Sequence, residues 1–382
     1  MNGFPRRERG STNPIFNDNR LKLGVFGLNG PGTVMTAHPD RFVPTWESSL
    51  KVSQTVDAAG FEALVPYSRW KPFGDARHVT GATLDTFAWA AGVSAATARS
   101  GVFSTCHAPT MHPLVVAKQG ATIDHISGGR FTLNVVVGWY TPEMETFGVD
   151  AADHADRYEL ADEWLTALKR LWTEEDEVDF DGRWVKVRGG VSTPKPVQAP
   201  LPPIMNAGGS DRGRHFAAKH ADVAFIIIRD DDPAAVRAQV ASYKQFARDE
   251  YGRDIQVWAY ALVQQAPSVG AAQDRIRTYV VDHPDDNSID IFLDYQVKNL
   301  GSMPPEAVAA LRQAVAAGGG VPLLGPPEVV AERLQMLSDC GLDGVLLTFV
   351  DYLTGAADFV AHVVPLLEQA GLRRPMQSGA AS

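Results

Sequence analysis

One stretch, residues 121–143 (ATIDHISGGRFTLNVVVGWYTPE), most constrains the fold of this chain of 382 residues. It begins inside an apolar helix predicted for residues 113–126. Gly128 and Gly129 end that helix, because glycine tolerates the left-handed conformation found at helix C-termini. The run that follows, residues 130–137, is rich in Phe, Leu and Val without polar alternation, which is typical of a parallel strand buried on both faces. The stretch therefore predicts one repeat of a βα architecture.

The same alternation of buried strand and helix recurs along the chain. Strands are predicted at residues 21–26, 64–66, 101–106, 130–137, 203–207, 223–228, 257–263 and 344–349. Helices are predicted at residues 44–59, 83–97, 113–126, 155–172, 212–220, 233–250 and 357–370, with further helices starting near residues 271 and 325. Eight such units predict an α/β fold, the (β/α)₈ TIM barrel, and an open doubly wound sheet is the alternative.

Two segments interrupt the alternation, and two lie outside it. Residues 177–188 alternate with period two around Asp181-Gly182, which predicts an inserted β-hairpin. Residues 282–324, before the last strand, are irregular apart from two helices near 289–300 and 305–317, and we interpret them as a lid-like insertion. With the barrel assigned to residues 20–372, residues 1–19 and 373–382 are predicted to be flexible tails.

Composition narrows the class of partner. The formal net charge is −10 without a basic run, which argues against nucleic acid and against an anionic membrane surface. Two cysteines make no disulfide framework, and the sequence has no apolar span of membrane length. These features predict a soluble cytoplasmic protein.

In a barrel of this kind, chemistry takes place where strands end and loops begin. Residues 206–213 (NAGGSDRG) take a strand through small residues into a helix opened by Ser210. The exposed backbone N–H groups there suit a phosphate, although an ordinary serine N-cap is the alternative. Arg157 and Tyr158 could contact the same phosphate or simply lie on the surface.

Two polar residues lie within buried strands. Asn134 must be satisfied either by backbone or by a ligand, and the sequence leaves both open. Thr105 poses the same choice, since threonine is also common in strands for packing reasons. No metal site is predicted: His107 and His112 are separated by a proline, and no HExxH motif occurs. The glycines of residues 27–32 lack the spacing of a dinucleotide fingerprint.

With these residues in view, the chain resembles the bacterial luciferase-like flavin monooxygenases, and within them the pyrimidine oxygenase and dimethylsulfone monooxygenase branch. The resemblance rests on residues 121–139, on GVLLTFVDY at 344–352, on AGGS at 207–210 and on Arg157-Tyr158, and it spans about residues 21–370. It implies a barrel that binds reduced FMN (FMNH₂) and uses O₂ as co-substrate. It also implies a separate NAD(P)H:flavin reductase and a homo-oligomer, either a dimer or a tetramer.

The resemblance also assigns roles to residues. Thr105 and Asn134 are the implied catalytic pair, near flavin N5 where oxygen is thought to react. The implied cofactor contacts are Tyr67 and Ser68 beside the ring, Asn134 and Glu143 at the ring and ribityl chain, and Arg157, Tyr158, Gly209 and Ser210 at the phosphate.

The chain departs from the branch at several positions, from which we expect a retained flavin site and an altered substrate site. Tyr67-Ser68 replaces an apolar pair. Val137 stands where a hydroxyl residue is expected, Arg69 where a lysine is expected, and Cys106-His107 where small apolar residues are expected. Arg69 would orient an anionic or carbonyl-bearing substrate. The substrate-binding candidates are Arg69, His107, Trp139 and Phe349.

The resulting hypothesis is a two-component monooxygenase, dependent on FMNH₂ and O₂, that oxidises a small polar heterocycle or amide through a flavin peroxide or N5-oxide. One alternative is C–S bond cleavage of a sulfone or sulfonate at the same flavin site. Others are a deazaflavin-dependent oxidoreductase on the same barrel and a non-catalytic flavin-binding protein.

Overall fold

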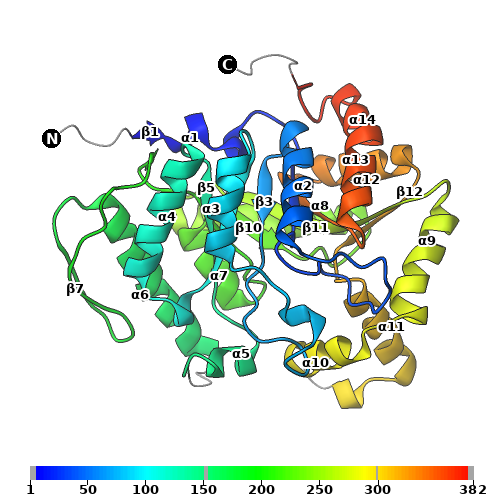
Figure 1. Cartoon of the computed structure of the whole chain (residues 1–382), viewed down its shortest axis with the longest axis horizontal. Helices are drawn as coiled ribbons and strands as arrows, with labels where there is room; N and C mark the ends of the chain where they lie inside the picture. Colours follow the sequence, from blue (N-terminus) through cyan, green and yellow to red (C-terminus); the bar gives the residue numbers. More distant parts are fainter. Residues whose placement is uncertain (1–5, 150–153, 298–299, 377–382) are drawn as a thin grey trace.

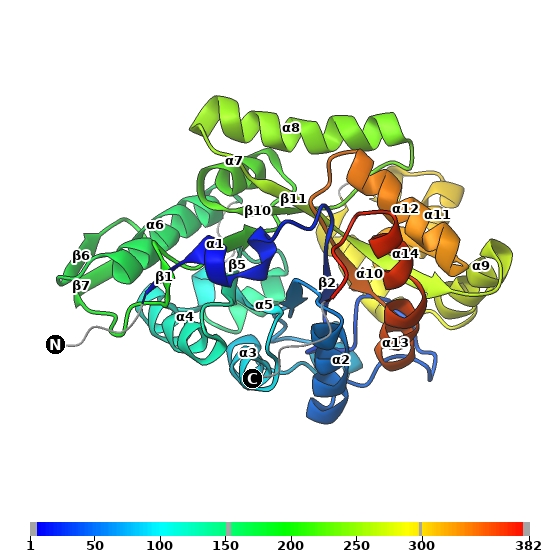
Figure 2. The same cartoon turned by 90° about the horizontal axis from the view of Figure 1, so that it is seen from above.

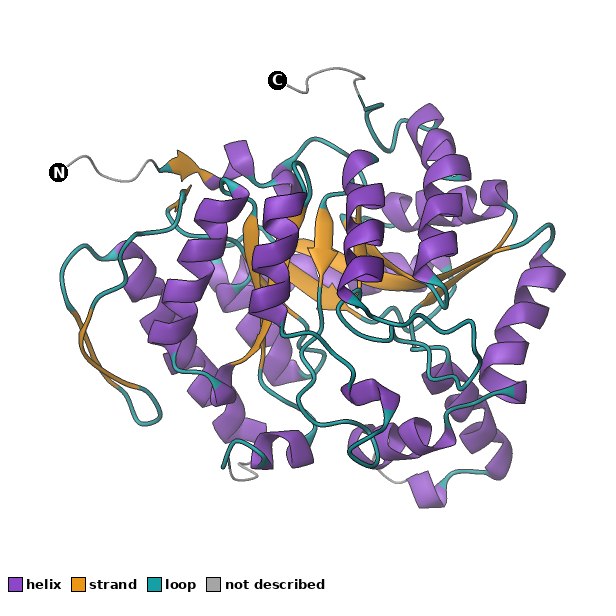
Figure 3. Ribbon diagram, viewed as in Figure 1, coloured by secondary structure: helices purple, strands orange, loops and turns teal. Residues whose placement is uncertain are grey.

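Eight parallel strands close into a barrel surrounded by helices in the computed structural model, which describes residues 6–149, 154–297 and 300–376 (Figures 1 and 3). The barrel strands are β2 (Lys22–Phe26), β3 (Ala63–Val65), β4 (Gly101–His107), β5 (Phe131–Val136), β9 (Ile204–Asn206), β10 (Val223–Ile226), β11 (Gln256–Gln265) and β13 (Gly344–Thr348). They pair in that order, and β13 pairs with β2 to close the ring. The predicted (β/α)₈ fold and its eight strands are confirmed.

The helices follow the strands as the sequence predicts. Those around the barrel are α2 (Trp46–Ala58), α3 (Thr86–Ala96), α4 (Pro113–Ser127), α6 (His154–Thr173), α7 (Asp211–His220), α8 (Pro233–Tyr251), α9 (Val269–Arg277), α12 (Pro327–Asp339), α13 (Tyr352–His362) and α14 (Val364–Gln369). Gly128 caps α4 at φ 68°, in the left-handed conformation that the two-glycine break predicts. None of the described helices is long and apolar enough to cross a lipid bilayer.

Side chains alternate between the barrel interior and the helix layer along each strand. A buried apolar cluster fills the barrel interior, and it is composed of Ile15, Ala63, Val65, Phe103, Met205, Val223, Phe225, Trp258 and Leu346. The larger outer cluster, between strands and helices, includes the neighbours Val102 and Cys106 of β4. On β4, Phe103, Thr105 and His107 therefore share the inward face.

The N-terminal segment is the closing element of the barrel floor rather than a tail. It forms β1 (Arg7–Glu8), which pairs with β8 (Gln198–Ala199), followed by α1 (Arg9–Thr12) and the turn η1 (Pro14–Phe16). Ile15 is fully buried in the interior cluster. Asn13 donates hydrogen bonds to Phe131 O and Thr132 Oγ1 of β5. The predicted flexible tail is wrong for residues 6–19, because one apolar side chain and one amide suffice to anchor a polar segment; residues 1–5 lie outside the described residues.

Replacing Ile15 with alanine is expected to lower the free energy of unfolding by about 2–5 kcal/mol, because the change leaves a cavity at a site where the surroundings are closely packed. Equilibrium urea unfolding measures the effect. Ile126→Ala is the matched control, since Ile126 is 44% exposed and its loss is expected to cost under about 0.5 kcal/mol. Equal stabilities of the two variants would contradict the role of residues 6–16, the N-terminal plug, in closing the barrel floor.

The prediction that the C-terminal tail begins at residue 373 is also wrong. Arg373, predicted to start a tail, is 4% exposed and donates from Nη1 to Glu62 Oε2 at 2.7 Å. Glu62 is fully buried and also accepts from Leu23 N. The described chain therefore remains attached to the barrel through Arg373, and residues 377–382 lie outside the described residues.

The hairpin insertion is confirmed as β6 (Val178–Asp181) paired antiparallel with β7 (Lys186–Gly190), at the left edge of the molecule in Figure 2. Its turn is longer than the Asp181-Gly182 dipeptide predicts. Asp181 and Lys186 form the last pair of the two strands, and a hydrogen bond from Gly182 N to Val185 O at 3.0 Å closes the loop between them.

The second insertion contains α10 (Asp286–Gln296), η5 (Leu300–Ser302) and α11 (Pro305–Ala316), preceded by one π-helical turn (Thr278–Asp282). It then ends in a strand, β12 (Val321–Gly325), that pairs in parallel with the second half of β11. The sequence prediction that residues 318–324 are irregular is wrong, because Pro322 and the flanking glycines conceal an edge strand. The first half of β11 closes the barrel, and the second half extends beyond it.

Candidate functional site

The candidate site lies at the C-terminal ends of the strands, at the lower edge of the view in Figure 1, where α5 (Thr141–Glu145) and α10 lie. The opposite end of the barrel is occupied by the N-terminal plug. Toward this lower edge the barrel interior becomes polar, with Thr105, His107 and Asn134 each at most 6% exposed. Since the N-terminal end is filled, a ligand has to enter from the C-terminal end.

Thr105 and Asn134 lie opposite each other on neighbouring strands and form one hydrogen-bonded unit. Thr105 Oγ1 donates to Pro66 O at 2.5 Å, and Asn134 Nδ2 donates to Thr105 Oγ1 at 3.1 Å. Asn134 Oδ1 is buried and has no hydrogen-bond partner among the described residues. A buried polar atom left unpaired costs about 1–3 kcal/mol, so this oxygen is a strong candidate acceptor for a ligand.

Glu143, at the start of α5, organises the loop that follows β3. The carboxylate is 1% exposed and accepts from the backbone N–H groups of Trp70 (2.6 Å) and Lys71 (3.2 Å). It also lies 3.5 Å from Arg69 Nη1 and 3.6 Å from His107 Nε2. The ribityl role implied by the resemblance stays a prediction. What the carboxylate does here is hold three consecutive residues of the loop in place.

Arg69 is enclosed rather than extended into solvent. Its guanidinium lies 4.2 Å from the centre of the Phe73 ring, 5.5 Å from Trp139 and 5.6 Å from Tyr140. Cation–π contacts of this kind and the Glu143 carboxylate together stabilise a cation that is 11% exposed. The side chain therefore already has a counter-ion within the protein.

His107 occupies the last inward position of β4. Burial lowers its pKa to about 4; the Glu143 carboxylate opposes that shift and the Arg69 guanidinium adds to it. The imidazole is consequently neutral at pH 7. Its Nδ1 is buried and has no partner among the described residues, which makes it a second unpaired polar atom beside Asn134 Oδ1.

The predicted phosphate cradle forms a helix N-terminus as expected. Ser210 caps α7, and its side chain accepts from Gly213 N at 3.1 Å. Gly208 and Gly213 are in contact through their backbones, so a Cβ at Gly208 would lie 2.5 Å from Gly213 Cα. A Cβ on Gly209 would instead meet open space. The turn therefore packs tightly on one side and stays open on the other.

Two further predicted residues approach this turn from α6. The hydroxyl of Tyr158 lies 2.6 Å from where a Gly213 Cβ would be, and it shares a side-chain hydrogen bond with Ser210. Arg157 Nη1 donates to Gly138 O at 2.6 Å, while its Nε is buried without a partner among the described residues. Four predicted phosphate contacts, Arg157, Tyr158, Gly209 and Ser210, are thus held by two elements, α6 and the turn into α7.

Comparison with known proteins identifies the group to which this barrel belongs. The sequence profile of the luciferase-like monooxygenases matches residues 21–344. The chain belongs to that family. It is 30% identical to a protein of Acinetobacter baylyi described as pyrimidine monooxygenase RutA, over 91% of this chain and 95% of that protein. A RutA of Cronobacter turicensis is also 30% identical, over 91% of this chain and 92% of that protein. The predicted family and the assignment as a flavin-dependent monooxygenase are confirmed.

Solved structures of the same fold agree over most of the chain. Riboflavin lyase RcaE, solved with a modified FMN and riboflavin, has a TM-score of 0.81 at 24% identity, covering 94% of each chain. Long-chain alkane monooxygenase LadA has the same TM-score at 22% identity, again over 94% of each chain. DmoA from Hyphomicrobium sulfonivorans has a TM-score of 0.79 at 21% identity, over 94% of this chain and 90% of that one. At these identities they bear on the fold alone.

Tyr67 and Ser68, predicted to lie beside the flavin ring in this family member, follow β3 at the barrel rim and are half-buried. Asn29 fixes Tyr67 by accepting from its N–H (3.0 Å) and donating to its carbonyl (2.8 Å). A Cβ at Gly30 would lie 2.1 Å from the Tyr67 hydroxyl. The glycine-rich turn after β2 therefore makes room for an aromatic ring, and the sequence reasoning missed Asn29, which holds that ring's backbone.

Phe349 does not lie where the sequence reasoning expects it. Its ring is 3% exposed in the outer cluster and packs against Tyr352 (5.6 Å) and Phe359 (6.4 Å) of α13. The prediction that Phe349 forms a wall of the substrate site is wrong, because the residue after β13 points toward the helix layer. Trp139, by contrast, is half-buried and in contact with Arg69 at the barrel rim.

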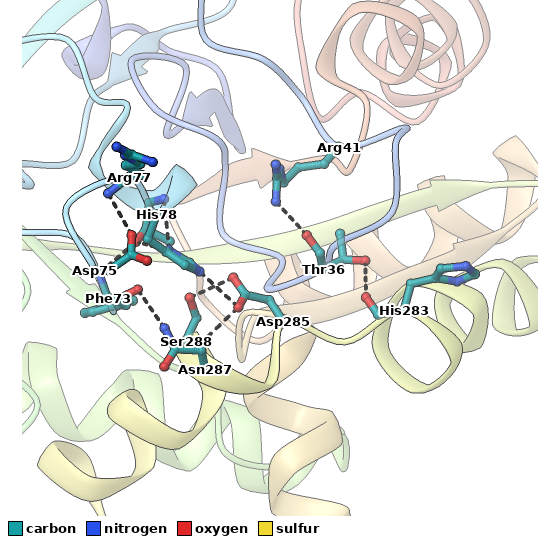
Figure 4. Close-up of polar contacts among 11 residues, drawn as sticks. Thr36, Arg41, Phe73, Asp75, Arg77, His78, His283, Asp285, Asn287 and Ser288 are labelled. Carbon is teal, nitrogen blue, oxygen red and sulfur yellow. Dashed lines mark hydrogen bonds and ion pairs between the residues drawn. The ribbon is translucent and has the colours of Figure 1, made fainter.

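The second insertion covers the aromatic residues around Arg69. Phe292 of α10 packs on Trp139 at 5.3 Å between ring centres, and Tyr295 packs on Tyr140 at 5.2 Å. Figure 4 shows how the start of α10 is attached to the loop after β3: Asn287 Nδ2 donates to Phe73 O, and His78 Nε2 lies 3.2 Å from Asp285 Oδ1. Sequence reasoning predicted an insertion here but could not identify these contact residues.

The low pKa of His107 predicts a specific pH dependence of stability. The unfolded chain binds a proton on this residue below about pH 6.5, whereas the folded chain does so only near pH 4. Stability is therefore lost as the pH falls from about 6.5 to about 4, by about 3 kcal/mol for a shift of this size. Urea unfolding of wild type and His107→Asn across that range measures the difference. Parallel pH curves for the two proteins would contradict a buried neutral imidazole.

Proposed function

We propose that this chain is a two-component monooxygenase that uses FMNH₂ and O₂ to oxidise a small polar heterocycle or amide. The observation that carries the proposal is the Asn134 amide, held by Thr105 at the mouth of the barrel, with its Oδ1 buried and without a hydrogen-bond partner in the described chain. The pyrimidine monooxygenase relatives, at 30% identity, support an amide-containing ring as the substrate class.

The residues fit FMN, which ends in one dianionic phosphate group, better than a cofactor that lacks a terminal phosphate. The capped start of α7, with open space at Gly209, suits a dianionic phosphate because its free N–H groups and the helix dipole attract anions. Arg157 adds a cation whose Nε is buried and has no hydrogen-bond partner in the part of the chain that the structure describes. Asn134 and Met205 are register partners on β5 and β9, so Asn134 and the turn that follows β9 lie on neighbouring strands and would hold different parts of one cofactor.

Bound reduced flavin supplies the two electrons that activate O₂. In this proposal the protein orients the reacting groups and excludes water from them. The Thr105 hydroxyl proton is committed to Pro66 O, so Thr105 orients Asn134 rather than donating to oxygen itself. The second N–H of Asn134 remains to donate where negative charge develops on oxygen. Trp139 and the residues of α10 packed on it would exclude water from the site.

We further propose that a separate NAD(P)H:flavin reductase delivers FMNH₂ and that the enzyme works as a homo-oligomer, a dimer or a tetramer. Both proposals rest on the family resemblance.

Rapid mixing tests the function directly. Protein loaded anaerobically with FMNH₂ is mixed with buffer containing ¹⁸O₂, and flavin absorbance is followed with a panel of pyrimidines, amides and sulfones. We expect re-oxidation kinetics that differ from those of free FMNH₂, and one ¹⁸O atom in the product of an amide or pyrimidine. Labelled product from sulfones alone would favour C–S oxidation. Substrate reduction by a reduced deazaflavin, with no oxygen transfer, would refute the proposal.

A further inference from the structure

His107 offers a ligand contact that the proposed function does not use. It lies two residues beyond Thr105 on the inward face of β4, at the rim of the barrel, and is 6% exposed. Because successive inward residues of a strand lie about 7 Å apart, the imidazole stands one level above the Thr105–Asn134 pair. A molecule that enters from the C-terminal end of the barrel would therefore meet the imidazole before it reached that pair.

The neighbouring carboxylate favours one tautomer of the neutral His107 ring. His107 Nε2 is the ring nitrogen near Glu143, 3.6 Å from Oε2. A carboxylate attracts an N–H group and repels a lone pair, so at this separation, which is longer than a direct hydrogen bond, it favours the neutral tautomer that carries the N–H on Nε2. Nδ1 is then the lone-pair nitrogen. It is buried and has no partner among the described residues, so it requires a donor.

The charges around His107 balance within the protein. Glu143 is paired with Arg69 at 3.5 Å, and Arg69 in turn stacks on Phe73. An anionic substrate beside His107 would therefore face the Nδ1 lone pair and the Glu143 carboxylate, with the nearby guanidinium already neutralised. A carbonyl or carboxylate oxygen cannot satisfy Nδ1, whereas an N–H or O–H group can.

We infer that His107 is a specificity residue of this site, whose Nδ1 accepts a hydrogen bond from an N–H or O–H group of an uncharged substrate. This inference rests on the proposed function, since it needs flavin in the barrel and the substrate above it. It replaces the expectation that Arg69 binds an anionic substrate: Arg69 instead serves as the counter-ion that holds Glu143, and through it the Nε2–H tautomer of His107.

Matched probes test the inference by binding rather than by turnover. Protein loaded with oxidised FMN is titrated with uracil, 2-pyridone and benzamide, then with their N-methylated forms 1,3-dimethyluracil, 1-methyl-2-pyridone and N,N-dimethylbenzamide. The anionic counterparts are orotate, picolinate and benzoate. Flavin difference spectra and calorimetry report affinity. We expect at least one N–H probe to bind about 10- to 100-fold more tightly than both its N-methylated and its anionic counterpart.

Two substitutions separate the ring nitrogens. His107→Asn keeps an acceptor near the Nδ1 position, whereas His107→Gln moves its amide toward the Nε2 position. We expect the preference for N–H over N-methyl probes to persist in H107N. In H107Q we expect it to fall to the small preference that the extra size of the methyl group alone produces. Because each variant is compared with itself across probes, a change in FMN affinity affects both probes alike.

Several results would overturn the inference: equal affinity for N–H and N-methyl probes, tightest binding of the carboxylates, discrimination by H107Q as strong as that of wild type, or no binding of any probe to the FMN-loaded protein. Failure of the wild-type protein to bind FMN at all is a different result, because it removes the proposed function itself.

Discussion

Replacing Asn134 with alanine is expected to lower the rate of substrate oxidation, measured as ¹⁸O incorporated into the product, by about 10²- to 10³-fold, the usual cost of removing one oriented donor to a developing oxyanion. The variant loses the second N–H and the unpaired Oδ1 together, but it leaves the start of α7 and Arg157 untouched. FMN binding should therefore survive. Steady-state kcat with supplied FMNH₂, alongside FMN affinity, measures the two effects separately.

Thr105 provides the matched controls for Asn134. Thr105→Ser keeps the hydroxyl that links Pro66 O to Asn134 Nδ2, whereas Thr105→Val keeps the shape and removes the link. We expect the serine variant to stay within a few-fold of wild type and the valine variant to lose about 10-fold or more, because Asn134 is no longer held in one orientation. Unchanged turnover in Asn134→Ala, with FMN bound, would remove this residue from the mechanism.

Replacing Arg373 with leucine is expected to lower the free energy of unfolding by about 3–5 kcal/mol. The change leaves the Glu62 carboxylate buried without its cation, and it deletes donors to Gly60 O and Leu21 O. Urea unfolding followed by circular dichroism measures the loss.

The neighbouring Arg374 supplies the control for Arg373. It pairs with Asp18 at 2.9 Å, but both side chains are more than 70% exposed. Exposed pairs of this kind contribute about 0–1 kcal/mol, so Arg374→Ala should be close to wild type. Similar losses for both arginines would show that burial of the Glu62–Arg373 pair is not what anchors this end of the chain.

Sequence periodicity predicted the barrel because its signal is local and repeated. Each buried strand is a short apolar run, and the cap at Gly128 marks a helix end within a few residues. The plug and the strand β12 escaped prediction because they depend on contacts far away in the chain. Ile15 is buried only because eight later strands surround it, and β12 is a strand only because β11 extends far enough to pair with it.

The site was predictable where the backbone itself makes it. Ser210 opens α7 as the small-residue turn indicates, and Thr105 and Asn134 face each other because their strands are neighbours in register. Side chains that depend on direction or pairing were not predictable in the same way. Phe349 points outward by the alternation of β13, and the enclosure of Arg69 requires rings from two separate loops.

The length of β11 has a consequence for how such enzymes diversify. The chain leaves β11 after Gln265 and returns beside it at Val321, the register partner of Ala261. The segment between these points, which comprises the barrel helix α9 and the second insertion, is a cassette whose two ends lie on neighbouring strands. The entropic cost of closing such a loop changes slowly with its length. Over evolution this cassette can be lengthened, shortened or exchanged while the eight barrel strands are inherited unchanged. A laboratory graft between relatives would most simply use the same two junctions.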